Sequence, residues 1–214
     1  MGLCDQGIFG AWRNKVGNVV GRVRQGRNVY AIYQPQVDNP KSFHQLRYRR
    51  TFSAFSKLAH NLLPILRIGF ASLDGYRYGS AFSSFIGYNI KYAYYSYDDI
   101  VGVVEIIYDT ITLSVGNVPL PLSPIASLDG SDFNVRWTDN TGESAAAADD
   151  VAYVCVYNPA KSTSIYDGKY TRIEQFAVIQ MPAAWSGDVV KAWLFMRDAK
   201  GNCSESRFLG SFNL

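Results

Sequence analysis

The stretch VAYVCVYN, residues 151–158, decides the fold class. Valine and tyrosine are enriched in β-strands, and the run ends at the turn-forming pair Asn158 and Pro159. A second run of this kind, VVKAWLFMR, spans residues 189–197 and ends at the turn cluster 198–202. Short runs of this type, separated by turn clusters, predict an antiparallel β-structure.

Further runs of the same type surround these two. They span residues 133–138, 163–166, 173–181 and 207–213. Six or seven short strands in about 90 residues predict an antiparallel sandwich of immunoglobulin or fibronectin type, without the paired cysteines of a true immunoglobulin domain. Trp137 and Trp193 lie within such strands and are expected in the core. Prolines at positions 119, 121 and 124 predict a stiff connection, so we expect two domains, residues 1–118 and 119–214.

The stretch VGNVVGRVRQGRNVYAIY, residues 16–33, combines glycines with basic residues. Gly21 and Gly26 have the spacing of the first half of a phosphate-binding P-loop, but the lysine and the hydroxyl residue of that loop do not follow. The stretch therefore predicts a β-hairpin, with strands at about 17–24 and 28–33 joined by a turn in which glycine adopts a positive φ.

Two helices are predicted after the hairpin. The first begins near Ser42 and runs for five or six turns to the region of Pro64, with apolar residues at helical spacing and basic residues between them. The second spans about 80–93, and β-rich runs follow at 101–107 and 111–115. The predicted fold class is α+β, with a small N-terminal module of a β-hairpin plus two helices, a β-rich insert and a C-terminal antiparallel immunoglobulin- or fibronectin-like β-sandwich.

Charge is distributed unevenly along the chain. Residues 1–60 hold ten Lys and Arg against two Asp and Glu, a net charge of +8, whereas residues 101–214 hold eight against thirteen, a net charge of −5. Such asymmetry is typical of an arm that meets nucleic acid or an acidic neighbour, and of head-to-tail self-assembly. The sequence shows no membrane-length apolar run and no secretory signal, so we expect a protein made in the cytoplasm without membrane contact.

Motifs for catalysis or metal binding are weak. His44 and His60 are sixteen residues apart, far from the i, i+4 spacing of a helical metal site. Carboxylates cluster at 139–150 without the ligand pattern of an EF-hand loop, so a solvated loop is favoured over a calcium site. The sequence holds no GxSxG motif, and its three cysteines form no CxxC pair. We therefore expect no enzymatic activity, no cofactor and no metal.

The residues that the patterns single out fall into two sets near the N-terminus. Candidates for an assembly contact are the glycines that shape the hairpin and the aromatic residues beside them, namely Trp12, Gly17, Gly21, Gly26, Tyr30 and Tyr33. Candidates for a basic face are arginines of the hairpin and the first helix, namely Arg22, Arg24, Arg27, Arg47, Arg49 and Arg50. Basic and aromatic residues together can bind nucleic acid, although a solvated or protein-facing surface explains the same residues.

Several motifs resemble an uncharacterised domain family. They are the segment from Gly10 to Gly21, LLPILRIGF at 62–70, WTDN at 137–140 and VYNP at 156–159, and they follow the order of the family over nearly the whole chain. The resemblance is to a family of unknown function found in gut Bacteroides-type bacteria and their phages, including crAss-like phages. A tyrosine-rich insert at 94–108 departs from the usual pattern and is expected to be a contact surface.

The resemblance implies a virion component of a tailed bacteriophage. We expect a subunit of an oligomeric neck or tail ring that assembles through its N-terminal hairpin, because a protruding hairpin can add to the sheet of a neighbouring subunit. The expected partners are further copies of the chain and other virion proteins such as portal, neck or tail components. Two alternatives stay open: a surface or glycan-binding module that uses Trp185, and a DNA-contacting packaging or injection protein that uses the basic residues.

Overall fold

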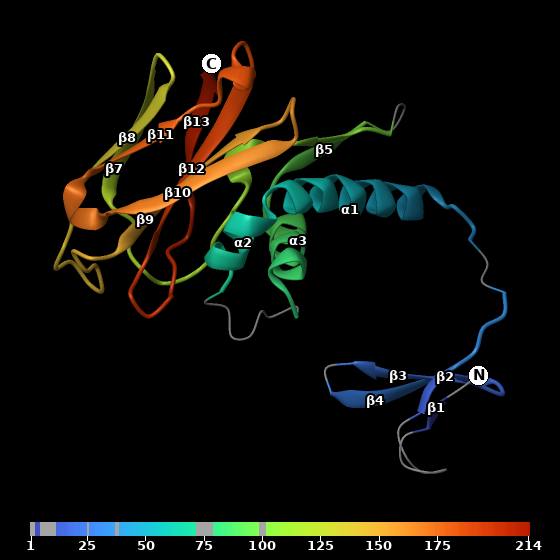
Figure 1. Ribbon diagram of the computed structural model, residues 1–214. Helices are drawn as coiled ribbons and strands as arrows, with labels where there is room; N and C mark the ends of the chain where they lie inside the picture. Colours follow the sequence, from blue (N-terminus) through green and yellow to red (C-terminus); the bar gives the residue numbers. More distant parts are fainter. Residues whose placement is uncertain (1–2, 5–11, 25, 37–38, 72–78, 99–101) are drawn as a thin grey trace. The chain divides into compact units, whose positions relative to one another are not determined.

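The computed structural model describes residues 3–4, 12–24, 26–36, 39–71, 79–98 and 102–214 (Figure 1). The chain forms two compact units, Met1–Ser42 and Phe43–Leu214. We call the first unit the arm and the second unit the body.

The arm is an antiparallel sheet with the strand order β1-β2-β3-β4. Its strands are β1 (Leu3–Cys4), β2 (Trp12–Val16), β3 (Val19–Arg24) and β4 (Arg27–Ile32). Gly17 and Gly26 lie in the turns with φ of +57° and +74°, the left-handed conformation that glycine adopts without strain. The predicted hairpin corresponds to β3 and β4, whereas β2 was not predicted. Because a strand rather than a helix follows Gly26, the stretch is not a P-loop.

The body begins with helices α1 (Phe43–Asn61), α2 (Leu63–Gly69) and α3 (Ala81–Tyr92). The predicted first helix is α1. Pro64 lies in the first turn of α2, where the missing N–H of proline costs no hydrogen bond. The second predicted helix is α3, and Ser80 caps it because its side-chain oxygen accepts a hydrogen bond from the Ser83 N–H at 3.1 Å.

The strands of the body form antiparallel sheets. The four-stranded sheet has the order β10-β9-β12-β13 and consists of β9 (Val151–Asn158), β10 (Thr163–Thr171), β12 (Val189–Arg197) and β13 (Arg207–Asn213). The three-stranded sheet has the order β11-β8-β7 and consists of β7 (Leu122–Asp129), β8 (Asp132–Thr138) and β11 (Phe176–Gln180). A separate hairpin pairs β5 (Tyr95–Tyr97) with β6 (Val104–Ile106).

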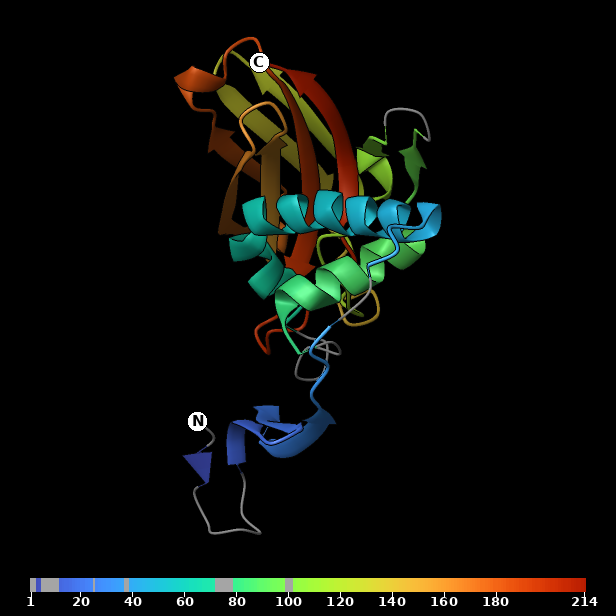
Figure 2. The ribbon, with the colours of Figure 1, turned by 90° about the vertical axis from the view of Figure 1, so that its right-hand side faces the viewer.

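The four-stranded sheet is the middle layer of the body. Val154 and Leu194 pack with the three-stranded sheet in one core cluster. Cys155 follows Val154 on β9, and Trp193 precedes Leu194 on β12, so both side chains point to the opposite face of the sheet. They pack with the helices in a second cluster. Figure 2 shows the helices lying across this sheet. Burial on both faces explains why the stretch 151–158 is almost continuously apolar rather than alternating.

The helices and the sheets of the body therefore share a core. Phe55 of α1, Phe85 of α3 and Trp193 of β12 belong to the same cluster. This arrangement differs from the sequence prediction, which placed a boundary between residues 118 and 119. The division between compact units falls instead between Ser42 and Phe43.

The segment 111–115, predicted as a strand, has no strand partner within the described residues. Side chains accept from two of its backbone N–H groups: the Thr112 N–H donates to Asn89 Oδ1 at 2.9 Å, and the Leu113 N–H donates to Ser206 Oγ at 2.7 Å. The Val115 N–H donates instead to the backbone carbonyl oxygen of Gly69. Ile111 and Leu113 are buried beside the helices. The apolar pattern of this segment therefore reflects core packing rather than a strand.

The predicted proline-rich connection also differs from the structure, because β7 begins at Leu122 and includes Pro124. β7 is an edge strand, and its pairing with β8 shifts register between Leu122 and Ile125. Proline is tolerated at such an edge irregularity because it lacks the N–H that regular pairing needs. The predicted run 173–181 is also divided, into a short 3-10 helix at Arg172–Glu174 and β11.

Within the described residues, no helix has both the length and the apolar character needed to cross a bilayer.

Candidate functional site

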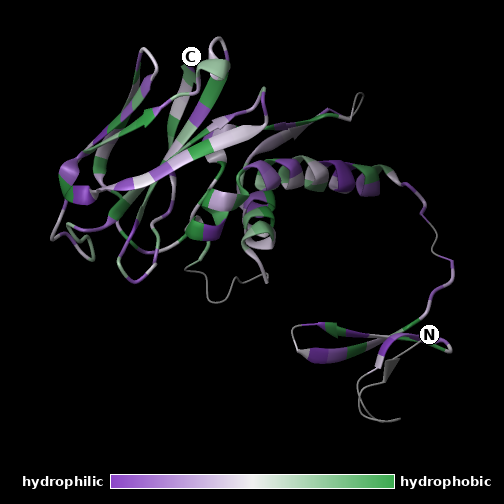
Figure 3. Cartoon of the chain, viewed as in Figure 1, coloured by the Kyte–Doolittle hydropathy of each residue, from purple (hydrophilic) through white to green (hydrophobic). Residues whose placement is uncertain are grey.

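Strand register gives the arm two chemically different faces. Gly21 pairs with Tyr30 and Val19 pairs with Ile32, so alternation places these side chains on the same side of the sheet. The apolar side chains on this side are those of Val16, Val19, Val23, Tyr30 and Ile32, and they share it with Gly21 and with the polar residues Asn14 and Asn28; we call this side the apolar face. The basic face consists of Lys15, Val20, Arg22, Arg24, Arg27, Val29 and Ala31. Figure 3 shows hydrophobic and hydrophilic residues side by side along these strands.

Trp12 packs on the apolar face. A Cβ atom on Gly21 would collide with the indole ring and the carbonyl oxygen of Trp12, so only glycine allows this close approach. The ring of Trp12 meets the ring of Tyr30 edge to face, with 5.3 Å between centroids. On the other face, the Lys15 ammonium lies 3.5 Å from the centre of the Tyr33 ring. The six assembly candidates thus lie in the strands and turns of the arm or directly after β4, but Tyr33 does not share a face with Tyr30.

No second layer of the arm's own described residues covers its apolar face. Ile32 is 80% exposed and Tyr30 is 46% exposed. Among residues 12–24, 26–36 and 39–42, only Gly21 is buried. The two core clusters contain no described residue of the arm. Covering exposed apolar side chains with another surface removes them from water, which is favourable. This face is therefore suited to contact another surface.

The predicted basic face is divided between the two units. Arg22, Arg24 and Arg27 are exposed on the arm, whereas the other three arginines are exposed on α1 of the body. A single face that joins both sets stays a prediction.

Two arginines of α1 are held by the tyrosine-rich insert. Arg50 donates a hydrogen bond to the Tyr97 hydroxyl at 3.2 Å, and the Arg47 guanidinium lies 5.4 Å from the centre of the Tyr97 ring. A Cβ atom on Gly102 would collide with the Arg50 guanidinium. The β5–β6 hairpin therefore positions Arg50 on the surface, beside Arg47. The use of the insert as a contact surface with a partner stays a prediction.

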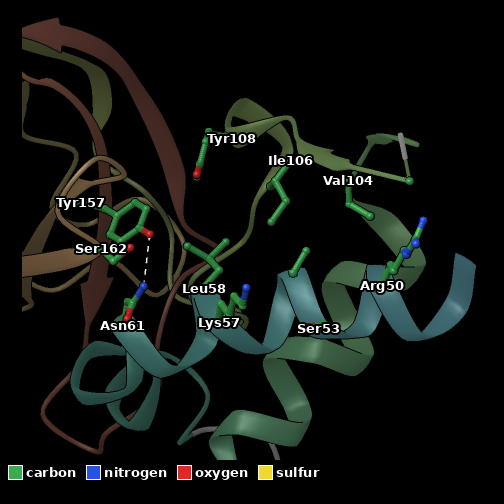
Figure 4. Close-up of a pocket in the computed structure, with 12 residues that line it drawn as sticks. Arg50, Ser53, Lys57, Leu58, Asn61, Val104, Ile106, Tyr108, Tyr157 and Ser162 are labelled. Carbon is green, nitrogen blue, oxygen red and sulfur yellow. Dashed lines mark hydrogen bonds between the residues drawn. The ribbon is translucent and has the colours of Figure 1, made fainter. Parts of the chain in front are cut away.

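A groove of about 400 Å³ lies between α1 and β6 (Figure 4). Its lining consists of Arg50, Ser53, Ala54, Lys57, Leu58, Asn61, Gly102, Val104, Ile106, Tyr108, Tyr157 and Ser162. These residues include two cations, several hydroxyl groups and no carboxylate. Burial, with a smaller contribution from Tyr157, raises the pKa of Tyr108 to about 12, so its phenol stays protonated and can donate a hydrogen bond. The groove is chemically suited to an anionic group.

The carboxylates clustered at 139–150, for which a solvated loop was favoured over a calcium site, differ in burial. Asp150 is fully buried and pairs with Arg172, with 2.8 Å between Oδ2 and Nη2. The Arg172 guanidinium also donates to Asn140 Oδ1 and to the Pro119 carbonyl oxygen, which ties the 139–150 loop to the connection before β7. Asp139 instead accepts hydrogen bonds from the Thr141 hydroxyl and N–H, which lower the pKa of its carboxyl. Among the described residues, no three His, Cys, Asp or Glu side chains are placed to hold a metal ion.

Other candidate residues lie apart from these surfaces. Trp185 is only 5% exposed and packs between the sheets, so it does not offer the open aromatic surface expected of a glycan site. His44 and His60 are exposed on α1, where their rings meet Phe43 and Phe82 respectively. Burial raises the pKa of the Cys155 thiol to about 12.

The fold and surfaces define an α+β protein with a small amphipathic strand arm. The chain belongs to a family of unknown function, DUF6266, whose model matches residues 10–210. The resemblance to an uncharacterised domain family is thereby confirmed, while an origin in gut bacteria or crAss-like phages stays a prediction. No curated protein matches the sequence.

Among solved structures, the spore cortex lytic enzyme SleM of Clostridium perfringens is similar to part of the chain. The sequence identity is 18% and the TM-score is 0.32, with 56% of this chain and 36% of the enzyme covered. The chain thus spans little more than a third of the length of that enzyme, and a similarity this low supports no assignment.

Proposed function

We propose that the protein is a structural subunit of a tailed-bacteriophage virion, and that it assembles into a neck or tail ring through its arm. The observation that carries this proposal is the uncovered apolar face of the arm, on which Ile32 is 80% exposed. Covering that face with a neighbouring copy would remove apolar surface from water, the main favourable contribution to association. Other virion proteins, such as portal, neck or tail components, are the further partners in this proposal.

The charge distribution of the chain also supports self-assembly. The net charge of +8 over residues 1–60 and −5 over residues 101–214 favours contact between different ends of neighbouring subunits. Contacts between different faces of identical subunits produce rings when their rotation closes. We assign the two packed sheets of the body to an immunoglobulin- or fibronectin-like sandwich, which in this proposal forms the rigid part of each ring subunit.

Native mass spectrometry of the full chain tests the proposal over a series of protein concentrations. We expect a discrete oligomer for the natural chain and a monomer for Ile32→Lys, which places a charge on the apolar face. Ile173→Lys is the matched control, because Ile173 is 57% exposed on the body. A natural chain that stays monomeric throughout, or equal assembly by Ile32→Lys, contradicts an arm-mediated ring.

Contact with DNA is a second candidate function, favoured by the cations of α1. Arg47, Arg49, Arg50 and Lys57 form no ion pair within the part of the chain that the structure describes. Each cation that neutralises a phosphate makes binding more sensitive to salt. If DNA binds here, Arg50→Glu/Lys57→Glu should weaken binding of a duplex oligonucleotide and flatten its salt dependence by about two phosphate contacts. Unchanged binding would remove this surface as the DNA site.

A further inference from the structure

The turn between β3 and β4 in the arm brings two arginines together. Arg24 and Arg27 are the last paired residues before the turn and lie directly opposite each other. Both side chains are exposed, and neither forms an ion pair with any described residue. Opposed residues of an antiparallel pair have Cβ atoms about 5 Å apart, and like charges there are destabilising. This turn therefore carries an uncompensated pair of positive charges.

The turn between β7 and β8 in the body has the opposite charge. Asp129 and Asp132 are the last paired residues before this turn and also lie directly opposite each other. Both are exposed, and their carboxylates have no ion pair or hydrogen bond to a described residue. Gly130 gives the turn its positive φ of +59°. Figure 1 shows the turn as a narrow loop at one end of the body.

Both turns place two residues between their last paired positions, and the paired residues carry opposite charge in the two turns. Each presents two charged side chains at the end of a tight hairpin, with the spacing that directly opposed residues impose. Two guanidinium groups at this spacing can each donate charge-assisted hydrogen bonds to one of two carboxylates at the same spacing. Contact between the turns would relieve the repulsion within both pairs.

We propose that the Arg24–Arg27 turn of one copy binds the Asp129–Asp132 turn of the next copy. This inference rests on the proposed ring assembly and names one of its contacts. Different surfaces of the same chain meet, so the contact is heterologous and can repeat around a ring. The apolar face of the arm supplies affinity in the assembly, and the charged turns fix which part of the neighbour the arm meets.

Charge reversal and its compensation test the contact in the full chain. One variant carries Arg24→Glu and Arg27→Glu, a second carries Asp129→Arg and Asp132→Arg, and a third carries all four substitutions. The first two should each raise the protein concentration needed for assembly by on the order of 100-fold, because like charges then meet. The third should assemble like the natural chain, because the pairs are restored with their signs exchanged.

A matched control separates the turn from the general charge of the body. Glu143→Arg with Asp149→Arg makes the same change in net charge at another exposed loop and should leave assembly intact. Thermal unfolding of each variant should match that of the natural chain, which shows that loss of assembly is not loss of folding.

The outcomes distinguish this inference from the proposal on which it rests. If the natural chain assembles and either charge-reversed double variant assembles equally well, the contact between the turns is overturned and the ring proposal stands. Loss of assembly that the fourfold variant does not restore also overturns the contact. A natural chain that remains monomeric at every concentration overturns both.

Discussion

In the body, both faces of the middle sheet are covered, and Val154 and Trp193 are fully buried. In the arm, strands that also contain valine, tyrosine and isoleucine form a sheet, but Ile32 remains 80% exposed. Valine, tyrosine and isoleucine thus produce strands in both units, and only in the body do other elements of the same unit cover them. The comparison teaches that strand-forming sequence determines local structure, whereas the covering layer determines whether a unit is self-sufficient.

The largest effect on the body should come from breaking its buried ion pair. Asp150→Ala leaves the fully buried Arg172 guanidinium without its counter-charge, which should lower the free energy of unfolding by about 3–5 kcal/mol. Urea unfolding followed by tryptophan fluorescence measures this, since Trp137 and Trp193 lie in the cores of the body. Lys169→Ala, which removes an ion pair whose lysine is 80% exposed, is the control and should change little. Equal effects of both variants would show that the buried pair does not hold the loop.

A second substitution should affect the arm and spare the body. Gly21→Val displaces Trp12, because the added Cβ atom occupies the position of its ring and carbonyl oxygen. We expect a rise of at least about 10-fold in the protein concentration needed for assembly, which corresponds to about 1.4 kcal/mol. The urea midpoint of the body should stay unchanged. Gly187→Val, at a positive-φ glycine of the body, is the converse control and should shift that midpoint without changing assembly of the folded protein.

Acid should destabilise the body, because every Asp and Glu among the described residues lies in this unit. Hydrogen bonds from the Lys161 ammonium and the Asn158 amide lower the pKa of Asp188 below its ordinary value of 3.8. A carboxyl with a lowered folded-state pKa stabilises the protein above its unfolded-state pKa, and this stabilisation is lost as the pH falls through the folded-state value. Unfolding free energies should therefore be level above about pH 5 and fall below about pH 4, less steeply in Asp188→Asn. Parallel curves for the two proteins would exclude a contribution from Asp188.

The smallest expected effect is on the chemical labelling of the buried thiols of the body, Cys155 and Cys203. Burial raises the pKa of Cys155 to about 12 and that of Cys203 to about 11, and only thiolates react rapidly. Brief treatment with iodoacetamide at pH 8 should leave both unmodified in the native protein and modify both in urea. Peptide mass spectrometry identifies the modified positions. Rapid native labelling of either residue would mean that the body opens locally.

Much of the fold could be predicted from local sequence. The predicted limits of β9, β12 and β13 match the structure, because each is a continuous β-prone run bounded by turn residues. α3 was also predicted, from its apolar spacing. β7 was missed because Pro124 normally argues against a strand, and only the edge position makes it acceptable.

The surfaces depended on contacts that sequence spacing does not reveal. The hairpin turn at Gly26 was predicted from the sequence. The packing of Trp12 on Gly21 was not, because it depends on the pairing of β2 with β3, and β2 was not predicted. The groove beside α1 combines Arg50 with Gly102 and Ser162, which lie far apart in the chain. Asp150 and Arg172 likewise lie together because the pairing of β9 with β10 places Val151 opposite Thr171. No local pattern identifies such partners.

Hydrogen–deuterium exchange of the full chain at low and high protein concentration tests the central claim most directly. If the arm is completed by another copy, the amides of β3 and β4 should exchange rapidly in the dilute protein and become protected as the concentration rises, while those of β9 and β12 stay protected throughout. Equal and strong protection of the arm at every concentration would contradict the account, because the arm would then be stable without a neighbour.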